Sequence, residues 1–588
     1  MTRWRLSLWA LAAAAALCAP YALSGAFRHA WQAHYPAEAS AWANDGRATL
    51  LGLYGTENQG DELVYAARVR EASERLLPYD PFILENRSRR VLAADGLSYH
   101  AMGLVLRAVG DINRAWLLVR VLCALLWFWL VRRLALALGA AEPLALFCAV
   151  FVVTFSYALT LCGVWMLDLS GPPLKALARG AWTLLSAGRT EGLQRLPRPG
   201  VTYVVLFLAA LLWTRAAESS RRRWALAAGL FAGLTPYFRL DVGSTVLLGA
   251  ALFTLAHART RLLKPLAAGL VLAALVALPY ALVNYPPDPE LVMRSKGSFG
   301  RQLYPLSLPY LLGALAAWRW AKRPAQTLLG CLLAAVFLIQ NSQLLTGVSI
   351  GWDHWSYFAN VLLFLLLLSW LPRRWAESRA WLPAAGLCCV LAFIQGVGYA
   401  AIHYPFQGLP KEHDAALRWL EREAPLDSVV LSLDPEVNLL VPAFTPSKVG
   451  FSETVAHISD LPLLESTRRV QEGLRLLGAD SRRFKKDCVD PYFFPDRRLM
   501  DTRSFPACRL VKTFYFHETL DDRVQALWAE AAAKPLEKPY RVDFVWIGPF
   551  ERQFIGKGFP ASGKLPLEKA FETGAGERAI TLYRVRRS

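Results

Sequence analysis

The chain has 588 residues, of which 55% are hydrophobic, and its mean hydropathy is +0.28. It is too long and too apolar to form a single soluble domain. The formal net charge of +19 would suit nucleic acid, but the basic residues fall in short loops between apolar runs, which argues against such a partner.

Apolar runs of about 20 residues can cross a bilayer as helices. We expect about eleven such spans. The short pair near residues 224–255 is expected to form two helices that lean together at one face. The first run has a basic start and could be a signal peptide, but the many later runs favour an uncleaved anchor. The expected spans are residues 6–26, 115–131, 144–167, 201–213, 224–237, 242–255, 266–283, 303–318, 327–345, 357–371 and 381–402.

Basic clusters occupy alternate short loops, which is the positive-inside pattern. This pattern places the N-terminus in the cytoplasm. An odd number of spans then puts the C-terminal part outside, together with the long first loop at residues 28–114. The predicted location is a bacterial inner membrane, with a multi-pass module over residues 1–402.

The first external loop is predicted to contain two short amphipathic helices. The segment AARVREASERLL, residues 66–77, spaces apolar residues for one helical face and is expected to lie along the membrane surface. The sequence Tyr79-Asp80-Pro81 should end it. The segment SYHAMGLVLRAVG, residues 98–110, predicts the second helix.

After residue 403 the hydropathy falls, and helical and strand patterns mix. Helices are expected at residues 412–425 and 462–478. Strands are expected at residues 427–434, 542–551 and 579–587. The predicted fold class is therefore a mainly α polytopic membrane protein with an external α/β domain at residues 403–588. Cys488 and Cys508 in that domain are either a disulfide or two buried thiols.

Two adjacent carboxylates, Asp61 and Glu62, open the segment GDELVYAARVRE at residues 60–71, directly after the first span. Acidic residues at a helix start can simply favour the positive end of the helix dipole. They can also accept a proton from an attacking hydroxyl, or hold a divalent cation beside a leaving phosphate. The segment alone leaves both readings open.

This segment, together with the long first loop, the many spans and the external C-terminal domain, resembles the GT-C-fold glycosyltransferases. The aminoarabinose transferases and protein mannosyltransferases share this layout. The resemblance implies a catalytic aspartate at Asp61, assisted by Glu62, and a sugar donor on a polyprenyl phosphate. It also implies a second acidic metal ligand in another external loop, for which Asp168 is the candidate. The following YDPFILENRSRR lacks the aromatic–Glu–Lys–Pro segment of the aminoarabinose transferases, which leaves the substrate open.

A lipid phosphate needs cations at the outer face, and arginine suits phosphate oxygens. For each such arginine, contact with lipid headgroups or solvent is the alternative. A loop with Asp353 and His354 between two tryptophans could add phosphate or sugar recognition. The candidate binding residues are Arg87, Arg89, Arg90, Arg195, Arg198, Arg239, Asp353 and His354.

The sequence contains no phosphate-loop motif, no HExxH and no CxxC, which argues against an ATP-driven pump, a zincin and a thiol-redox enzyme. The expected function is transfer of a hexosyl or pentosyl group from a polyprenyl-phosphate donor to a lipid, glycan or protein acceptor. No cofactor is required, although Mg²⁺ or Mn²⁺ at Asp61 and Asp168 would fit. The alternative is a non-enzymatic transporter or an envelope-assembly or binding protein.

Overall fold

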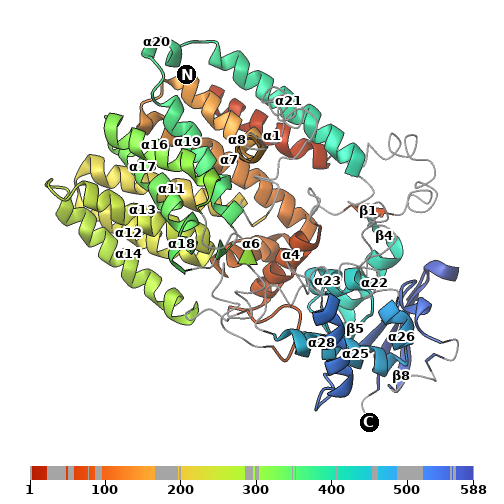
Figure 1. Ribbon diagram of the computed structural model, residues 1–588. Helices are drawn as coiled ribbons and strands as arrows, with labels where there is room; N and C mark the ends of the chain where they lie inside the picture. The colour runs from red at the N-terminus through yellow and green to blue at the C-terminus, as the bar shows by residue number, and fades with distance from the viewer. Residues whose placement is uncertain are drawn as a thin grey trace.

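The computed structural model has a bundle of long helices and, at one end of it, a smaller part with a β-sheet (Figure 1). The N-terminus and the short helix α20 (Arg373–Ala376) lie at the end of the bundle away from the sheet. The structure describes residues 3–22, 48–50, 59–76, 78–86, 96–165, 196–197, 200–284, 296–297, 303–346, 349–350, 352–403, 408–452, 461–486, 521–556, 559–560 and 565–586.

A helix covers each of the eleven apolar runs. The helices are α1 (Arg3–Ala22), α7 (Ile112–Leu138), α8 (Glu142–Trp165), α11 (Gly200–Ser219), α12 (Arg222–Phe238), α13 (Leu240–Ala256), α14 (Leu263–Asn284), α16 (Leu308–Trp320), α17 (Pro324–Gln340), α19 (Trp352–Leu368) and α21 (Trp381–His403). By length and composition, four helices in the described residues can cross a membrane: α7, α11, α14, and α17 with the short helix α18 (Gln343–Thr346) that continues it. Membrane crossing by the other seven stays a prediction.

The expected pair of short helices is α12 and α13, which meet at one extended residue, Arg239. Small side chains let this pair and α14 pack closely. A Cβ atom on Gly229 of α12 would lie 2.0 Å from the carbonyl oxygen of Gly269 in α14, and one on Gly243 of α13 would lie 2.5 Å from Pro236. Helices in lipid associate through such close backbone contacts, because apolar burial alone does not drive their association there.

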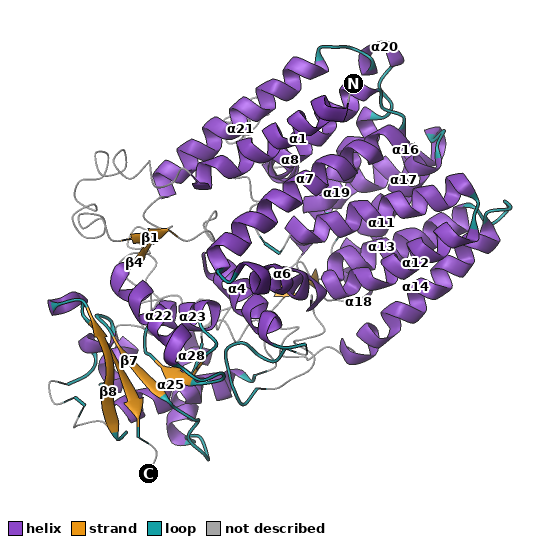
Figure 2. Cartoon of the chain, turned by 180° about the vertical axis from the view of Figure 1, so that it is seen from behind, coloured by secondary structure: helices purple, strands orange, loops and turns teal. Residues whose placement is uncertain are grey.

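The two helices of the first loop are α4 (Gln59–Glu74) and α6 (Gly96–Val109). The first of them does not show the single buried apolar face that its sequence predicts, and its place along the membrane surface stays a prediction. Both views show α4 between the bundle and the C-terminal part, where it packs against α6 and against α23 (Pro435–Phe444) (Figures 1 and 2). Its buried residues face all directions around the helix: Glu62, Leu63, Val64, Ala66, Ala67, Arg68, Val69, Glu71 and Ala72.

The C-terminal part is built on a five-stranded sheet of order β6-β5-β7-β9-β8, with helices packed beside it (Figure 2). Strand β5 is parallel to both β6 and β7, while β7, β9 and β8 pair antiparallel. The elements are α22 (Lys411–Glu423), β5 (Val429–Leu431), β6 (Lys448–Val449), α25 (Leu463–Leu477), α28 (Asp521–Ala533), β7 (Phe544–Ile547), β8 (Leu567–Thr573) and β9 (Ile580–Val585). The predicted helices and strands at α22, α25, β5, β7 and β9 are confirmed, whereas α23, α28, β6 and β8 were not predicted.

Two short antiparallel pairings connect loops that are distant in sequence. Strand β1 (Ala48–Leu50) pairs with β4 (Gly408–Pro410), so the first loop is tied to the start of the C-terminal part. Strand β2 (Lys296–Gly297) pairs with β3 (Ser349–Ile350), which joins the segments before α16 and α19. All four strands belong to segments that the sequence predicts to be external.

The crevice between the carboxyl ends of β5 and β7 is filled by the chain itself. Glu551 is fully buried there and accepts hydrogen bonds from Ser432 Oγ at 2.5 Å and from the N–H groups of Leu433 and Asp434 at 3.0 Å. The Gly548 N–H donates a fourth at 2.9 Å. Ligands of α/β sheets usually bind at such a crevice. Here the Glu551 carboxylate already accepts hydrogen bonds from the hydroxyl and the three backbone N–H groups at this crevice.

His413 on α22 gives the C-terminal part a specific acid sensitivity. Its ring lies 5.6 Å from that of Trp546, and its Nδ1 is enclosed without a hydrogen-bond partner in the described residues. The side chain as a whole is only half-buried, but the enclosed nitrogen decides its titration. Burial lowers the pKa of His413 from 6.5 to about 4. The unfolded chain therefore takes up this proton at a higher pH than the folded chain.

We expect the stability contributed by neutral His413 to be complete above pH 6.5 and to fall between pH 6.5 and 4, by up to about 3 kcal/mol. Hydrogen exchange of residues 411–423 should therefore accelerate on acidification more in the wild type than in His413→Phe. Other titrating groups are shared by both proteins and cancel in the comparison. Equal pH dependence in the two proteins would contradict the assignment.

Candidate functional site

The start of α4 is anchored inside the protein by Glu62. This carboxylate is 1% exposed. It accepts a 2.8 Å hydrogen bond from Trp116 Nε1 of α7 and a 3.3 Å bond from the backbone N–H of Leu196. Three segments that are distant in sequence therefore meet at Glu62: the first loop, α7 and the segment that precedes α11. The bonds fix the position and rotation of the helix turn that carries Asp61.

A second contact joins α4 to α6 through Arg68 and Tyr99. The Arg68 guanidinium donates to the Tyr99 hydroxyl at 3.1 Å and lies 5.4 Å from the centre of its ring. The ring of Tyr65, one turn earlier on α4, is 6.4 Å from that of Tyr99. Burial raises the pKa of Tyr99, against the opposing effect of the Arg68 charge. The phenol therefore stays protonated and can act as a hydrogen-bond donor.

The junction of α12 and α13 brings a buried ion pair to the same end of the bundle. Arg239 Nε lies 2.8 Å from Asp241 Oδ1, and both residues are buried. The backbone at Arg239 is extended, with φ −170°. Non-helical backbone at membrane depth is tolerated where it is buried in protein or lines a polar cavity. Ser98 Oγ of α6 donates to the Phe238 carbonyl at 2.8 Å, which holds α6 against this junction.

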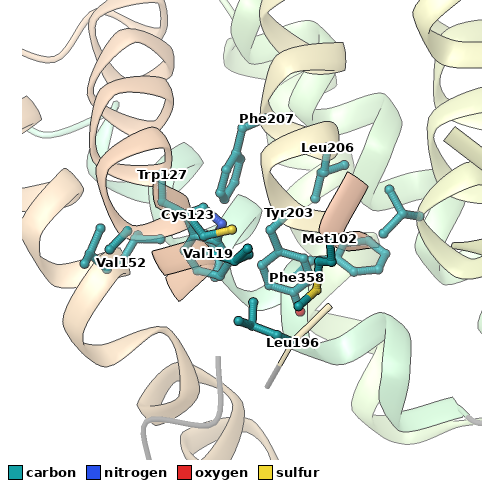
Figure 3. Packing of buried hydrophobic residues seen from close by; sticks show 14 of the residues in the cluster. Met102, Val119, Cys123, Trp127, Val152, Leu196, Tyr203, Leu206, Phe207 and Phe358 are labelled. Carbon is teal, nitrogen blue, oxygen red and sulfur yellow. The ribbon is translucent and has the colours of Figure 1, made fainter. Parts of the chain in front are cut away.

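Tyr203 on α11 lies in an aromatic cluster inside the bundle. Its ring stacks on Trp127 at 5.0 Å and meets the edge of Phe358 at 6.0 Å, with Leu196 nearby (Figure 3). In the described part of the chain, no group hydrogen-bonds to the buried Tyr203 hydroxyl. A ligand or water is the usual partner of such a group.

Uncharged polar groups extend this region across α16, α17 and α19. The Tyr310 hydroxyl donates to Asn360 at 2.9 Å, and the Gln340 amide donates to Ser356 at 3.1 Å. Tyr310 lies in the first turn of α16 and Gln340 in the last turn of α17, whereas Ser356 and Asn360 lie in the second and third turns of α19. Polar groups inside a membrane bundle bind one another or face a polar interior. The charged contacts are therefore flanked by amides and hydroxyls.

The structure shows the surroundings of only two of the predicted site residues, Glu62 and Arg239. Both are buried at the same end of the bundle. Asp61 lies in the first turn of α4, but its side chain is outside the described residues, and the same holds for Asp353 and His354 in the first turn of α19. Also outside them are Arg87, Arg89, Arg90, Arg195, Arg198, Asp168, Cys488 and Cys508.

Sequence reasoning missed Arg68, Tyr99, Tyr203 and Arg120. Arg120 is completely buried in α7, one turn after Trp116. It could have been found, since a single arginine within an otherwise apolar span is a functional candidate by default. Arg68 and Tyr99 carry no such signal, because each lies in a segment of mixed polarity and their contact spans 31 residues.

The described residues contain no group of three or more histidine, cysteine or acidic side chains that could hold a metal ion. The predicted pair Asp61 and Asp168 lies outside the side chains described, so a metal there stays a prediction. What the described residues do supply is positive charge and hydroxyl donors. Arg68, Arg239 and Tyr99 together are suited to phosphate oxygens.

No protein-family model matches this chain, and no curated protein matches it. Among solved structures, the cryo-EM structure of the arabinofuranosyltransferase AftD from Mycobacteria is similar over 100% of this chain, with 14% sequence identity and a TM-score of 0.49. This chain spans 40% of the length of that structure. A similarity of this size carries no argument about fold or activity.

Proposed function

We propose that this chain is a membrane glycosyltransferase of GT-C type. It moves a sugar from a polyprenyl-phosphate donor to an acceptor hydroxyl at the outer face of a bacterial cell membrane. The observation that carries the proposal is the meeting of Glu62, Arg68, Tyr99 and the Arg239–Asp241 pair, from three separate parts of the chain, at one end of the bundle. The hydrogen bond from Ser98 to the Phe238 carbonyl joins the part with Tyr99 to the part with Arg239.

Helix geometry relates Asp61 to this cluster. Positions 61, 65 and 68 are spaced by four and three residues, so they lie along one face of α4. Tyr65 and Arg68 on that face contact Tyr99. We therefore assign Asp61 as the general base, with the cationic groups two turns further along the same helix. Glu62 lies on a different face and serves to anchor the helix.

In the proposed reaction, the acceptor oxygen attacks the anomeric carbon of the donor while Asp61 takes up the proton of that hydroxyl. The bond from the anomeric carbon to the phosphate oxygen breaks, and the electron pair leaves with the lipid phosphate. Arg68 and Arg239 would stabilise this growing negative charge, and the Tyr99 hydroxyl would donate to it. Positive charge develops on the sugar ring, as in glycosidic cleavage generally.

The proposed orientation follows from the connections between helices. Arg132 and Arg133 lie near the end of α7. The loops after α11, α13, α16 and α19 carry basic residues and share the end of the bundle where the N-terminus lies (Figure 1). Such loops favour the cytoplasmic side. The cluster at Arg239 and the C-terminal sheet then lie outside. Lipid-linked donors are accessible there, whereas nucleotide sugars are not.

Turnover by the purified full-length protein tests the function directly. The protein would be placed in vesicles with synthetic polyprenyl-phospho-pentose or polyprenyl-phospho-hexose carrying a radiolabelled sugar, together with a membrane extract as acceptor. We expect release of free polyprenyl phosphate together with transfer of label to the acceptor fraction. Binding of these donors without release in any combination, or movement of intact donor between leaflets, would instead support the non-enzymatic alternative.

A further inference from the structure

Four charged residues at the far end of α4 form a contact between the C-terminal part and the rest of the chain. Lys448 Nζ lies 2.5 Å from Glu71 Oε2, with side-chain exposures of 5% and 4%. Arg75 forms ion pairs with Glu71, at 3.4 Å, and with Asp427. Lys448 also lies 3.9 Å from Asp427. We call Glu71, Arg75, Asp427 and Lys448 the α4 clamp.

The two C-terminal members of the clamp are held by the sheet. Lys448 is the first residue of β6, and Asp427 precedes the adjacent parallel strand β5. Asp427 has a φ of 62°, a left-handed conformation that aspartate adopts more readily than most residues. The Lys448 N–H donates to the Ser428 carbonyl at 2.7 Å. The clamp charges are therefore presented by backbone that the sheet fixes.

Further bonds hold the same junction in register. The Val449 N–H of β6 donates to the Phe82 carbonyl at 2.8 Å, and Arg469 of α25 pairs with Glu85 at 3.0 Å. On the other side of α4, Arg70 pairs with Glu421 of α22 at 2.9 Å. The C-terminal part therefore contacts α4 and the segment after it from three of its own elements.

A buried ion pair adds little net stability compared with an apolar pair, but it tolerates only one geometry. The contact of α4 with α23 is supplemented at the far end of the helix by the clamp, whereas Glu62 holds the first turn. The clamp therefore fixes the end of α4 that Glu62 does not hold. Since a helix transmits a shift along its axis, loss of the clamp is expected to displace the first turn of α4, about 14 Å away.

We infer that Lys448 and Asp427 are positioning residues, through which the C-terminal sheet sets the placement of Asp61 at the opposite end of α4. This inference rests on the proposed function for its effect on turnover, whereas the mechanical coupling along α4 can be measured without any activity. The C-terminal part is then a component of the transferase site, although none of its clamp residues touches the reacting atoms.

Three variants of the full-length protein test this inference. Lys448→Met leaves the Glu71 carboxylate without its lysine. Glu71→Gln/Lys448→Met removes both charges and should recover the amount of folded protein. Lys448→Arg keeps the charge and should restore function. The matched control is Lys569→Met, which breaks an exposed pair with Glu572 in the same part of the chain.

The first measurement is hydrogen exchange of the amides of residues 63–67, at the start of α4 and remote from the clamp. We expect at least ten-fold faster exchange in Lys448→Met and in the double variant, and unchanged exchange in Lys448→Arg and Lys569→Met. Faster exchange confined to residues 71–76 would overturn the inference, because the disturbance would then be local.

The second measurement is turnover. We expect kcat to fall about ten-fold in the double variant, with the KM for the lipid donor changed less than two-fold, although the variant is as stable as the wild type. A purely structural ion pair predicts that kcat recovers together with stability, and that result would overturn the inference. If the wild type shows no transfer, the proposed function fails, and the exchange measurement decides the coupling by itself.

Discussion

Replacing Asp61 with asparagine is expected to slow sugar transfer by about 10²–10⁴-fold, the usual contribution of a positioned general base. The asparagine side chain has nearly the same shape but cannot accept the acceptor's proton. Donor binding should change little, so kcat should fall while KM stays within a few-fold. The measurement is release of polyprenyl phosphate at saturating donor. The amount of folded protein in the membrane is measured alongside it.

Asp414→Asn is the matched control for this experiment. Asp414 lies on α22, 2.9 Å from Arg418, in an ion pair with an exposed arginine. The same chemical change there should leave turnover within two-fold of wild type. Wild-type turnover in Asp61→Asn would remove the general base from the proposal. Loss of folded protein in Asp61→Asn, rather than loss of turnover, would indicate that Asp61 acts only as part of the helix start.

The second large effect is expected at Arg239. Replacing it with methionine leaves the Asp241 carboxylate buried without its 2.8 Å partner. Breaking a buried pair in this way costs about 3–5 kcal/mol. If Arg239 also binds the donor phosphate, the KM for the donor should rise by roughly 10–100-fold, the equivalent of one lost charged hydrogen bond. Thermal stability in detergent and donor KM are the two readouts.

The double variant Arg239→Met/Asp241→Asn separates these two roles. It removes both buried charges, so stability should largely return, whereas the donor KM should stay high. A stable double variant with wild-type KM would show that Arg239 serves only Asp241. Arg215→Met is the control. Arg215 is 60% exposed, lies 3.9 Å from Glu218 near the opposite end of the bundle, and should change neither readout.

The long helices could be predicted from the sequence because their signal is local. Each of the eleven apolar runs corresponds to a helix, and the short pair expected near residues 224–255 is α12 and α13. In the C-terminal part, α22 ends just before Pro425 as its sequence indicates, and Gly478 ends α25 in a left-handed conformation. An apolar run forms its backbone hydrogen bonds within its own helix, and proline and glycine end a helix locally. Neither signal depends on the rest of the chain.

The surroundings of α4 could not be predicted in this way. Its sequence predicted one apolar face, but its buried residues lie all around the helix. Arg68 and Glu71, which lie off that predicted face, are 8% and 4% exposed, because each has a buried partner elsewhere in the chain. Tyr99 supplies one partner, 31 residues away, and Lys448 the other, 377 residues away. A charge can be buried only when such a partner exists.

The sequence by itself determined the number and type of the long helices, the polarity of their connections and the acidic pair that opens α4. These properties depend on hydropathy and helix-end chemistry, which act over a few residues. Only the tertiary structure decided that Glu62 meets Trp116, that Ser98 joins α6 to the junction at Arg239, and that the C-terminal sheet holds α4. Glu62 and Trp116 are 54 residues apart, and Glu71 and Lys448 are 377 residues apart. No local pattern encodes which charge will meet which partner over such separations.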